Sequence, residues 1–217
     1  MVYHLVFQLL FIFKVLKKYQ RLLFLDVETT GLDSVKDRVI EIGAVKIDRD
    51  GNISKYSRLI NPGFKISREI RKLTGIKQKE LANAPLIEDI ADEIKDVLKA
   101  DLFIAHNAKF DFDFISNEMM RMEWPLEIPY IDTIKIAKAF YPNYLSYNLS
   151  SLIDRMGFKV EKRHRGLDDA NVLWELFNKI KNDFGVEDLE SKIDKLFVPA
   201  KKTKITTSKD QVLLFNL

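Results

Sequence analysis

Apolar and polar positions in the first third of the chain follow the two-residue period of β-strands. Three segments are predicted on this basis: Leu22–Val27, Val39–Ile47 and Ile53–Ile60. The first is almost continuously apolar, whereas in the second Ile40 and Ile42 alternate with Glu41, as in an antiparallel strand that buries one face. The polar turn 48–52 joins the last two strands, which predicts a hairpin.

Beyond this hairpin the pattern changes to the helical period, interrupted by one short apolar strand at Leu102–Ala105. The predicted helices are Ser67–Leu73, Ile87–Lys99, Phe112–Met122, Thr133–Phe140, Leu149–Met156 and Asp168–Lys181. Strands that first form hairpins and then alternate with helices predict an α/β fold, a mixed β-sheet flanked by helices.

Composition narrows the class of protein. With 217 residues, the chain has room for one sizeable domain and appendages. Lys and Arg (35) barely outnumber Asp and Glu (32), so a nucleic acid would be bound locally in a cleft rather than over a broad basic surface. The absence of cysteine excludes a thiolate metal site and is typical of a reducing compartment, so we expect a cytoplasmic protein.

Two carboxylates follow the first predicted strand, in the run Leu25-Asp26-Val27-Glu28-Thr29-Thr30-Gly31. Residues i and i+2 of a strand point to the same face, so Asp26 and Glu28 emerge side by side. Neighbouring negative charges at the end of an apolar strand are costly unless a cation offsets them. A divalent metal ion is the simplest such cation.

Two further motifs offer the remaining ligands. The run His106-Asn107-Ala-Lys-Phe110-Asp111 follows the strand at 102–105, and the run His164-Arg-Gly-Leu-Asp168-Asp169 opens the last predicted helix. Carboxylates at strand ends and at a helix start can meet at the carboxyl edge of a sheet. Asp26, Glu28, Asp111 and Asp169 offer hard oxygen ligands, which suit Mg²⁺ or Mn²⁺ better than zinc. Four acids exceed what a single ion needs, so we expect two ions.

Together, Asp-x-Glu-Thr-Thr-Gly, His-Asn-x-x-Phe-Asp and His-x-x-x-x-Asp resemble the three motifs of the DEDDh exonuclease family. This DnaQ-like family includes the proofreading epsilon subunit of bacterial DNA polymerase III. The resemblance covers about residues 21–181, with the motifs in order, and it implies a ribonuclease H-like fold. Each motif is a weak signal alone, whereas three in register are a strong one.

The resemblance also implies roles for individual residues. Asp26, Glu28, Asp111 and Asp169 would hold two Mg²⁺ (or Mn²⁺) ions, and His164 would activate the attacking water. The positions that line the pocket for the terminal nucleotide in such enzymes are occupied here by Thr29, Thr30, His106, Asn107 and Phe110. A histidine suits proton transfer at neutral pH, and two ions suit phosphodiester hydrolysis.

Several residues have alternative interpretations. His164 stands among basic residues and could contact phosphate only, and His106 could be a hydrogen-bonded structural residue. Asp113 and Asp168 are interpreted as solvated carboxylates near helix starts rather than as ligands. Asp132 is expected at a helix N-terminus, with a supporting role behind the site as the alternative.

The N-terminal residues 1–20 form an apolar extension ahead of the exonuclease domain, 21–182. As a helix, its apolar run Val2–Phe13 would measure roughly 18 Å, short of the ~30 Å hydrocarbon core, so we expect no transmembrane span. It also lacks the features of a secretory signal. Packing on the domain or a partner, contact with a membrane surface, and a nonfunctional extension remain open.

After the domain, we expect a short amphipathic helix (183–198), a flexible linker (199–210) and a terminal peptide (211–217). The peptide contains Gln211, Leu214 and Phe215 in the pattern Gln-x-x-Leu-Phe, which resembles the clamp-binding peptide of bacterial replication proteins. A glutamine with a Leu-Phe pair suits binding in an apolar groove, and a tether would concentrate the nuclease at a sliding clamp. The alternative is an apolar tail that folds back on its own domain.

The leading hypothesis is a metal-dependent 3′→5′ exonuclease that acts on single-stranded or frayed DNA 3′ ends, in proofreading or in clamp-associated repair. A replicative polymerase subunit is a possible partner, although the chain stops soon after the peptide. An exonuclease that trims RNA 3′ ends remains an alternative, as does a non-catalytic scaffold that binds a clamp or polymerase. A haloacid-dehalogenase-type phosphatase fits poorly, because that class needs Asp at the position of Glu28.

Overall fold

The computed structural model describes residues 19–160 and 163–200. Most of the apolar extension 1–20 and of the linker 199–210, and all of the terminal peptide 211–217, therefore lie outside the described residues. Within the described ranges, no helix is both long enough and apolar enough to cross a membrane.

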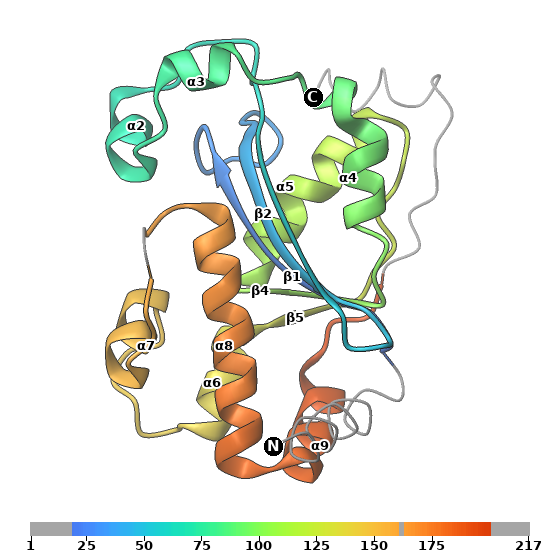
Figure 1. Cartoon of the computed structure of the whole chain (residues 1–217), viewed down its shortest axis with the longest axis vertical. Helices are drawn as coiled ribbons and strands as arrows, with labels where there is room; N and C mark the ends of the chain where they lie inside the picture. The colour runs from blue at the N-terminus through green and yellow to red at the C-terminus, as the bar shows by residue number, and fades with distance from the viewer. Residues whose placement is uncertain (1–18, 161–162, 201–217) are drawn as a thin grey trace, which may run out of the picture.

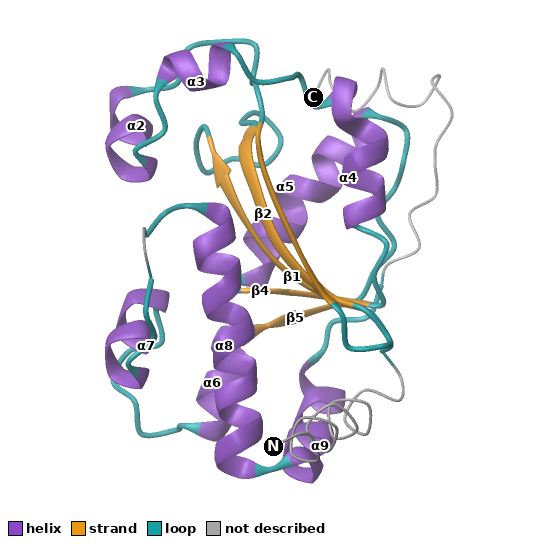
Figure 2. Ribbon diagram, viewed as in Figure 1, coloured by secondary structure: helices purple, strands orange, loops and turns teal. Residues whose placement is uncertain are grey.

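One mixed sheet organises the domain, as predicted (Figure 2). Its strand order is β3-β2-β1-β4-β5. The strands are β1 (Leu22–Thr29), β2 (Val39–Ile47), β3 (Ile53–Leu59), β4 (Leu102–Ala105) and β5 (Tyr130–Asp132). Strand β1 is antiparallel to β2 and parallel to β4, and β4 is parallel to β5. The three-residue strand β5 was not predicted, because so short a segment carries no readable period.

The predicted helices are present with shifted ends, and the five-residue helix α3 was not predicted. They are α2 (Arg68–Thr74), α3 (Gln78–Ala82), the 3₁₀ helix η1 (Glu88–Ile90), α4 (Ala91–Val97), α5 (Ala108–Arg121), α6 (Thr133–Phe140), α7 (Leu149–Met156), α8 (Gly166–Phe184) and α9 (Val186–Leu196). Helix α5 begins earlier than predicted, which places Asp111 in its first turn. Helix α8 also begins earlier, and Asp169 stays in its first turn. Asp132 caps α6 by accepting a hydrogen bond from Ile134 N, which confirms its predicted place at a helix start.

Helices cover both faces of the sheet (Figure 1). Leu22 and Phe24 of β1 join one core cluster with α6, α7, α8 and α9. The alternate residues Leu23 and Leu25 join a second cluster with α4 and α5. Because successive strand side chains point to opposite faces, the apolar run of β1 fills both layers of core.

Strand β2 corrects one prediction. It was expected to bury one face, yet of its nine residues only Lys46 is not fully buried. Glu41, assigned to the polar face from the sequence, is 1% exposed. The half-buried prediction was wrong because α8 covers the face that carries Glu41, while Ile40 and Ile42 are buried on the other face.

The start of α8 packs directly on β2 at a pair of glycines. A Cβ atom on Gly43 would lie 1.8 Å from the carbonyl carbon of Gly166 and 1.9 Å from Leu167 N. The helix can approach this closely only because neither position carries a side chain. The two glycines therefore fix how near the first turn of α8, with Asp169, comes to the sheet.

The segment after α8 packs on the same domain. Ile193 of α9 is 3% exposed and belongs to the core cluster of α6 and α8. Beyond α9, Val198 forms two backbone hydrogen bonds with Tyr130 of β5, at 2.7 and 3.0 Å. These contacts attach residues 186–198 to the open edge of the sheet.

We predict that Gly43→Ala destabilises the fold by about 1–3 kcal/mol, because the added methyl group forces the backbone of α8 away from β2. Urea denaturation measures the free energy of unfolding. Ser57→Ala is the matched control, since Ser57 pairs with Gly43 on β3 and is exposed. Equal stability of the Gly43→Ala and Ser57→Ala proteins would contradict the glycine contact.

Candidate active site

Asp26 and Glu28 lie on the face of β1 that α8 covers. They continue the alternation of Leu22 and Phe24, so the apolar core of this layer ends in two carboxylates. Glu28 is 8% exposed and Asp26 is partly exposed. As predicted from their spacing, the two acids emerge on the same side of the sheet.

Asp111 reaches the same strand from the first turn of α5. Its Oδ1 accepts a hydrogen bond of 3.0 Å from the backbone N–H of Val27, the residue between Asp26 and Glu28. The side chain is 3% exposed. Two segments separated by 84 positions in the sequence thus meet at the end of β1.

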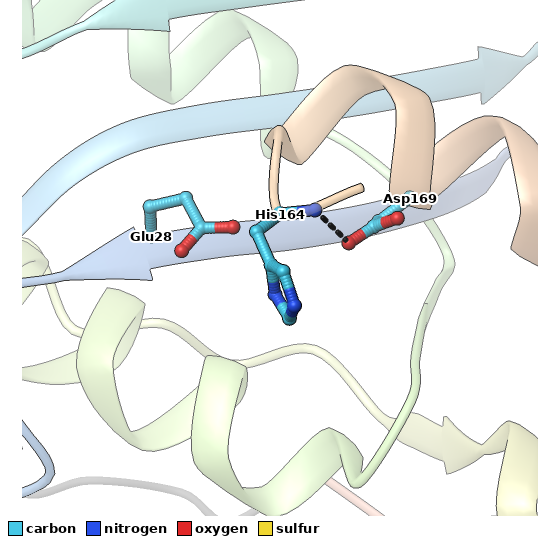
Figure 3. A group of neighbouring side chains, drawn as sticks. All are labelled: Glu28, His164 and Asp169. Atoms are coloured by element: carbon cyan, nitrogen blue, oxygen red, sulfur yellow. Dashed lines mark hydrogen bonds between the residues drawn. The ribbon is translucent and has the colours of Figure 1, made fainter. Parts of the chain in front are cut away.

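Asp169, in the first turn of α8, supplies the fourth acid and is 4% exposed. Its Oδ2 accepts a hydrogen bond of 3.2 Å from His164 N. Potential ligand atoms of Glu28, His164 and Asp169 all lie within 4.8 Å of one another (Figure 3). The backbone of His164 has a positive φ of 57°, an uncommon conformation that turns the loop just before α8.

Burial and mutual repulsion shift these acids strongly. Burial raises the pKa of Glu28 to about 8, and the neighbouring Asp169 and Glu41 carboxylates add to the shift. Burial also raises the pKa of Asp111 to about 8. The pKa values of Asp26 and Asp169 are raised as well, first by burial and, for Asp26, by the other acids. These carboxyl groups repel one another when they are ionised, and a divalent cation would offset that repulsion. Mg²⁺ and Mn²⁺ fit, because they prefer hard oxygen ligands.

Arg163 is a basic side chain in direct contact with the acids. It forms an ion pair with Asp169, and its charge opposes the rise in the pKa of Asp26, Glu28 and Asp169. From the sequence, Arg163 was only one basic loop residue among several. Its position next to His164 was the one sign in the sequence that it could lie at the site. The direction of its side chain could not be inferred, because a loop has no periodic pattern.

Both predicted pocket threonines are held by hydrogen bonds at the end of β1. Thr29 donates its hydroxyl to the carbonyl oxygen of Gly31 at 2.6 Å, and Thr30 donates to Asp37 Oδ1 at 3.0 Å. The Thr30 hydroxyl oxygen also accepts from Arg38 N. These bonds shape the turn after β1, while a substrate role for the two residues stays a prediction.

The predicted pocket residues between β4 and α5 are held in place by local contacts, and their substrate role stays a prediction. His106 Nδ1 lies 2.9 Å from Thr133 Oγ1, and burial lowers the pKa of this histidine to about 4. Asn107 takes a left-handed conformation at φ 59°, and its N–H donates to Asp132 Oδ1 at 3.1 Å. The ring of Phe110 packs on Phe114. His106 is thus a neutral, hydrogen-bonded ring at neutral pH.

The two acids set aside from the sequence lie apart from this cluster. Asp113 forms an ion pair with Lys109 on the exposed side of α5. Asp168 is partly exposed and does not belong to the group formed by Glu28, His164 and Asp169. Neighbouring Asp168 and Asp169 differ because only the second faces the sheet.

Comparison with known proteins gives one family. The model of the RNase_T family, described as an exonuclease, matches residues 23–177. The chain is 38% identical over 155 residues to the DNA polymerase III subunit epsilon of Treponema pallidum, covering 70% of this chain and 72% of that protein. It is 41% identical over 156 residues to the PolC-type DNA polymerase III of Thermotoga maritima, covering 70% of this chain. The chain spans only 11% of that polymerase's length.

Solved structures agree with this family. Exonuclease X in complex with 5′ overhanging duplex DNA has 26% identity and a TM-score of 0.61, covering 78% of this chain and 99% of that one. The nuclease domain of 3′hExo, a DEDDh family member bound to rAMP, shows the same fold at 18% identity, with a TM-score of 0.65 and coverage of 78% and 95%.

The fold and family predicted from the three motifs are therefore confirmed. The family match, over residues 23–177, includes Asp26, Glu28, Asp111 and Asp169. The chain belongs to the RNase_T exonuclease family and is related to the DNA polymerase III epsilon subunit.

Proposed function

We propose that this exonuclease removes nucleotides from single-stranded or frayed DNA 3′ ends in a replication setting, as a proofreading or repair nuclease. The observation that carries the proposal is the convergence of four acids from β1, α5 and α8 beside His164. The two relatives found by sequence, from Thermotoga maritima and Treponema pallidum, support DNA rather than RNA as the substrate, since both are DNA polymerase III proteins.

In this proposal Asp26, Glu28, Asp111 and Asp169 hold two Mg²⁺ or Mn²⁺ ions. Such ions, when bound, lower the pKa of water and offset charge on the phosphate and the leaving 3′ oxygen. The protein fixes where the ligand side chains lie. Asp111 keeps its side chain fixed through Val27 N, and the carboxylate of Glu28 is almost fully removed from bulk water.

His164 is proposed to take the proton from the attacking water. Its ring lies beside Glu28 and Asp169, and its backbone is bonded to Asp169, so the ring stands next to the acids that hold the ions (Figure 3). A general base of this kind contributes about 10²–10⁴-fold to a rate. Thr29, Thr30, His106, Asn107 and Phe110 are proposed to contact the terminal nucleotide from the turn after β1 and the start of α5.

Partners follow from the relatives and from the terminal peptide. Because the chain corresponds to a small part of a PolC-type polymerase and most of an epsilon subunit, we propose association with a replicative polymerase. Gln211, Leu214 and Phe215 are proposed to bind a sliding clamp. The domain division at 21–182 and the linker at 199–210 belong to the same proposal.

We predict that Asp169→Asn abolishes nuclease activity, because it removes a charged ligand while keeping the shape of the side chain. Release of nucleotides from a 3′-labelled single-stranded DNA in Mg²⁺ measures the activity, with a matched RNA alongside. Asp168→Asn is the control and should keep the wild-type rate. Near-normal digestion by Asp169→Asn would refute the ligand assignment, and faster digestion of the RNA would refute the choice of DNA.

The raised pKa values predict an unusual dependence of stability on pH. The folded protein holds protons on Glu28 and Asp111 up to about pH 8, whereas their unfolded values are 4.5 and 3.8. Between these limits the folded state binds more protons, so the free energy of unfolding falls as pH rises. Urea denaturation in a chelator should show a loss of at least about 1 kcal/mol from about pH 5.5 to about pH 8.5.

Millimolar Mg²⁺ or Mn²⁺ should restore this stability at the higher pH, because the ions bind the ionised acids. Glu28→Gln should flatten the metal-free profile. A metal-free stability that stays constant or rises over the same interval would show that the acids are not repelling one another as inferred.

Removing residues 211–217 should leave the digestion of short oligonucleotides unchanged and abolish co-elution with a bacterial sliding clamp, because the peptide is proposed to act only as a tether. The combined variant Gln211→Ala, Leu214→Ala, Phe215→Ala should behave like the deletion. Asn216→Ala is the control and should retain clamp binding. Co-elution of the truncated chain would place the clamp contact elsewhere.

A further inference from the structure

One buried acid beside the site is not explained by the metal ligands. Glu41 is 1% exposed and pairs directly with Glu28 across the β1–β2 ladder. Like charges directly opposite one another destabilise a sheet. The charge of Glu41 must therefore be offset by a positive partner of its own, separate from the proposed metal ions.

Both oxygens of Glu41 are occupied by the loop that carries His164. Arg165 Nε donates to both carboxylate oxygens at 3.0 Å, and its terminal NH2 donates to Oε1 at 2.8 Å. The backbone N–H of Gly166 donates to Oε2 at 3.2 Å. With these bonds in place, Glu41 is an anchor for the loop rather than a fifth metal ligand.

The anchor acts on the residues next to His164 in the chain. Arg165 is the N-cap residue of α8, and Gly166 lies against Gly43, where no side chain fits. On its other side, His164 N is bonded to Asp169. The left-handed turn at His164, with φ 57°, is thus held from both ends.

We propose that Glu41 and Arg165 are a positioning pair that sets the direction of the His164 ring toward the attacking water. This inference rests on the proposed role of His164 as general base. Neither residue touches the reacting atoms. A planar guanidinium that contacts both oxygens of a buried carboxylate fixes direction as well as distance, which a loop with a positive φ needs.

The fold contains a matched pair for comparison. Glu118 is also 1% exposed, accepts from Arg38 Nε at 2.9 Å and accepts from the backbone N–H of Val39 at 3.2 Å. That pair joins α5 to β2 and makes none of the hydrogen bonds of the His164 loop. Removing the Arg38–Glu118 pair tests the effect of losing a buried ion pair while the contact between Glu41 and Arg165 is kept.

The experiment compares Arg165→Ala, Arg165→Lys, Glu41→Gln and Glu118→Gln on a short single-stranded DNA. We expect Arg165→Ala and Glu41→Gln to lower kcat about 100-fold with KM changed less than about threefold, since a misplaced base costs rate rather than binding. Arg165→Lys keeps the charge but loses the planar guanidinium that contacts both oxygens of Glu41. Its kcat should therefore lie between that of Arg165→Ala and that of wild type. Glu118→Gln should lower the melting temperature comparably and change kcat less than about twofold.

Combination with His164→Ala separates positioning from general structural damage. If the pair acts through His164, then Arg165→Ala added to His164→Ala lowers kcat no further. Calorimetric titration with Mn²⁺ should give the same affinity for Arg165→Ala as for wild type, because the four acids are retained.

Three results would overturn the proposal. They are a wild-type kcat in both Arg165→Ala and Glu41→Gln, multiplicative losses in the double variant, and a loss of Mn²⁺ affinity that accounts for the lower rate. Each of these can occur while His164→Ala alone is impaired, which leaves the proposed function standing. A His164→Ala enzyme of unchanged rate would instead remove the role of His164 itself, and the positioning inference with it.

Discussion

The structure depends on the accommodation of four carboxylates at one end of β1, where three of them are almost completely buried. Burial and mutual repulsion both oppose their ionisation, and each adds to the raised pKa values of the cluster. Apolar side chains of similar volume often stabilise a fold more than buried charges do, so we infer that the acids are kept for what they bind. In the proposed function, divalent cations would offset this repulsion by binding the ionised acids, and the same rigid frame would hold the acids with and without the ions.

That frame is made from contacts distant in sequence. Asp111 is bonded to the backbone of β1, the first turn of α8 approaches β2 through Gly43 and Gly166, and Arg165 spans from α8 to Glu41. Each contact joins a helix to β1 or β2, two interior strands of the sheet. The acids are therefore placed by buried contacts between helices and the sheet, while the loop that carries His164 is anchored by an ion pair.

The sequence predicted the parts of this picture that depend on local pattern. The spacing of Asp26 and Glu28, the long apolar segments and the three motifs were enough for the mixed sheet, the family and the four acids. Glu41 was misassigned because a charged residue in an alternating strand is usually solvent-facing, and only the packing of α8 buries it. The contact of Arg163 with Asp169 depends on the direction of a loop, which no periodicity encodes.

Calorimetric titration of the metal-free protein with Mn²⁺ at about pH 7.5, in buffers of different ionisation enthalpy, tests the central claim most directly. It reports both the number of ions bound and the protons released. Because acids with pKa values of about 8 must lose protons when they ligate an ion, the account predicts uptake of two ions per chain with net proton release. Absence of uptake, or uptake without proton release, would contradict it.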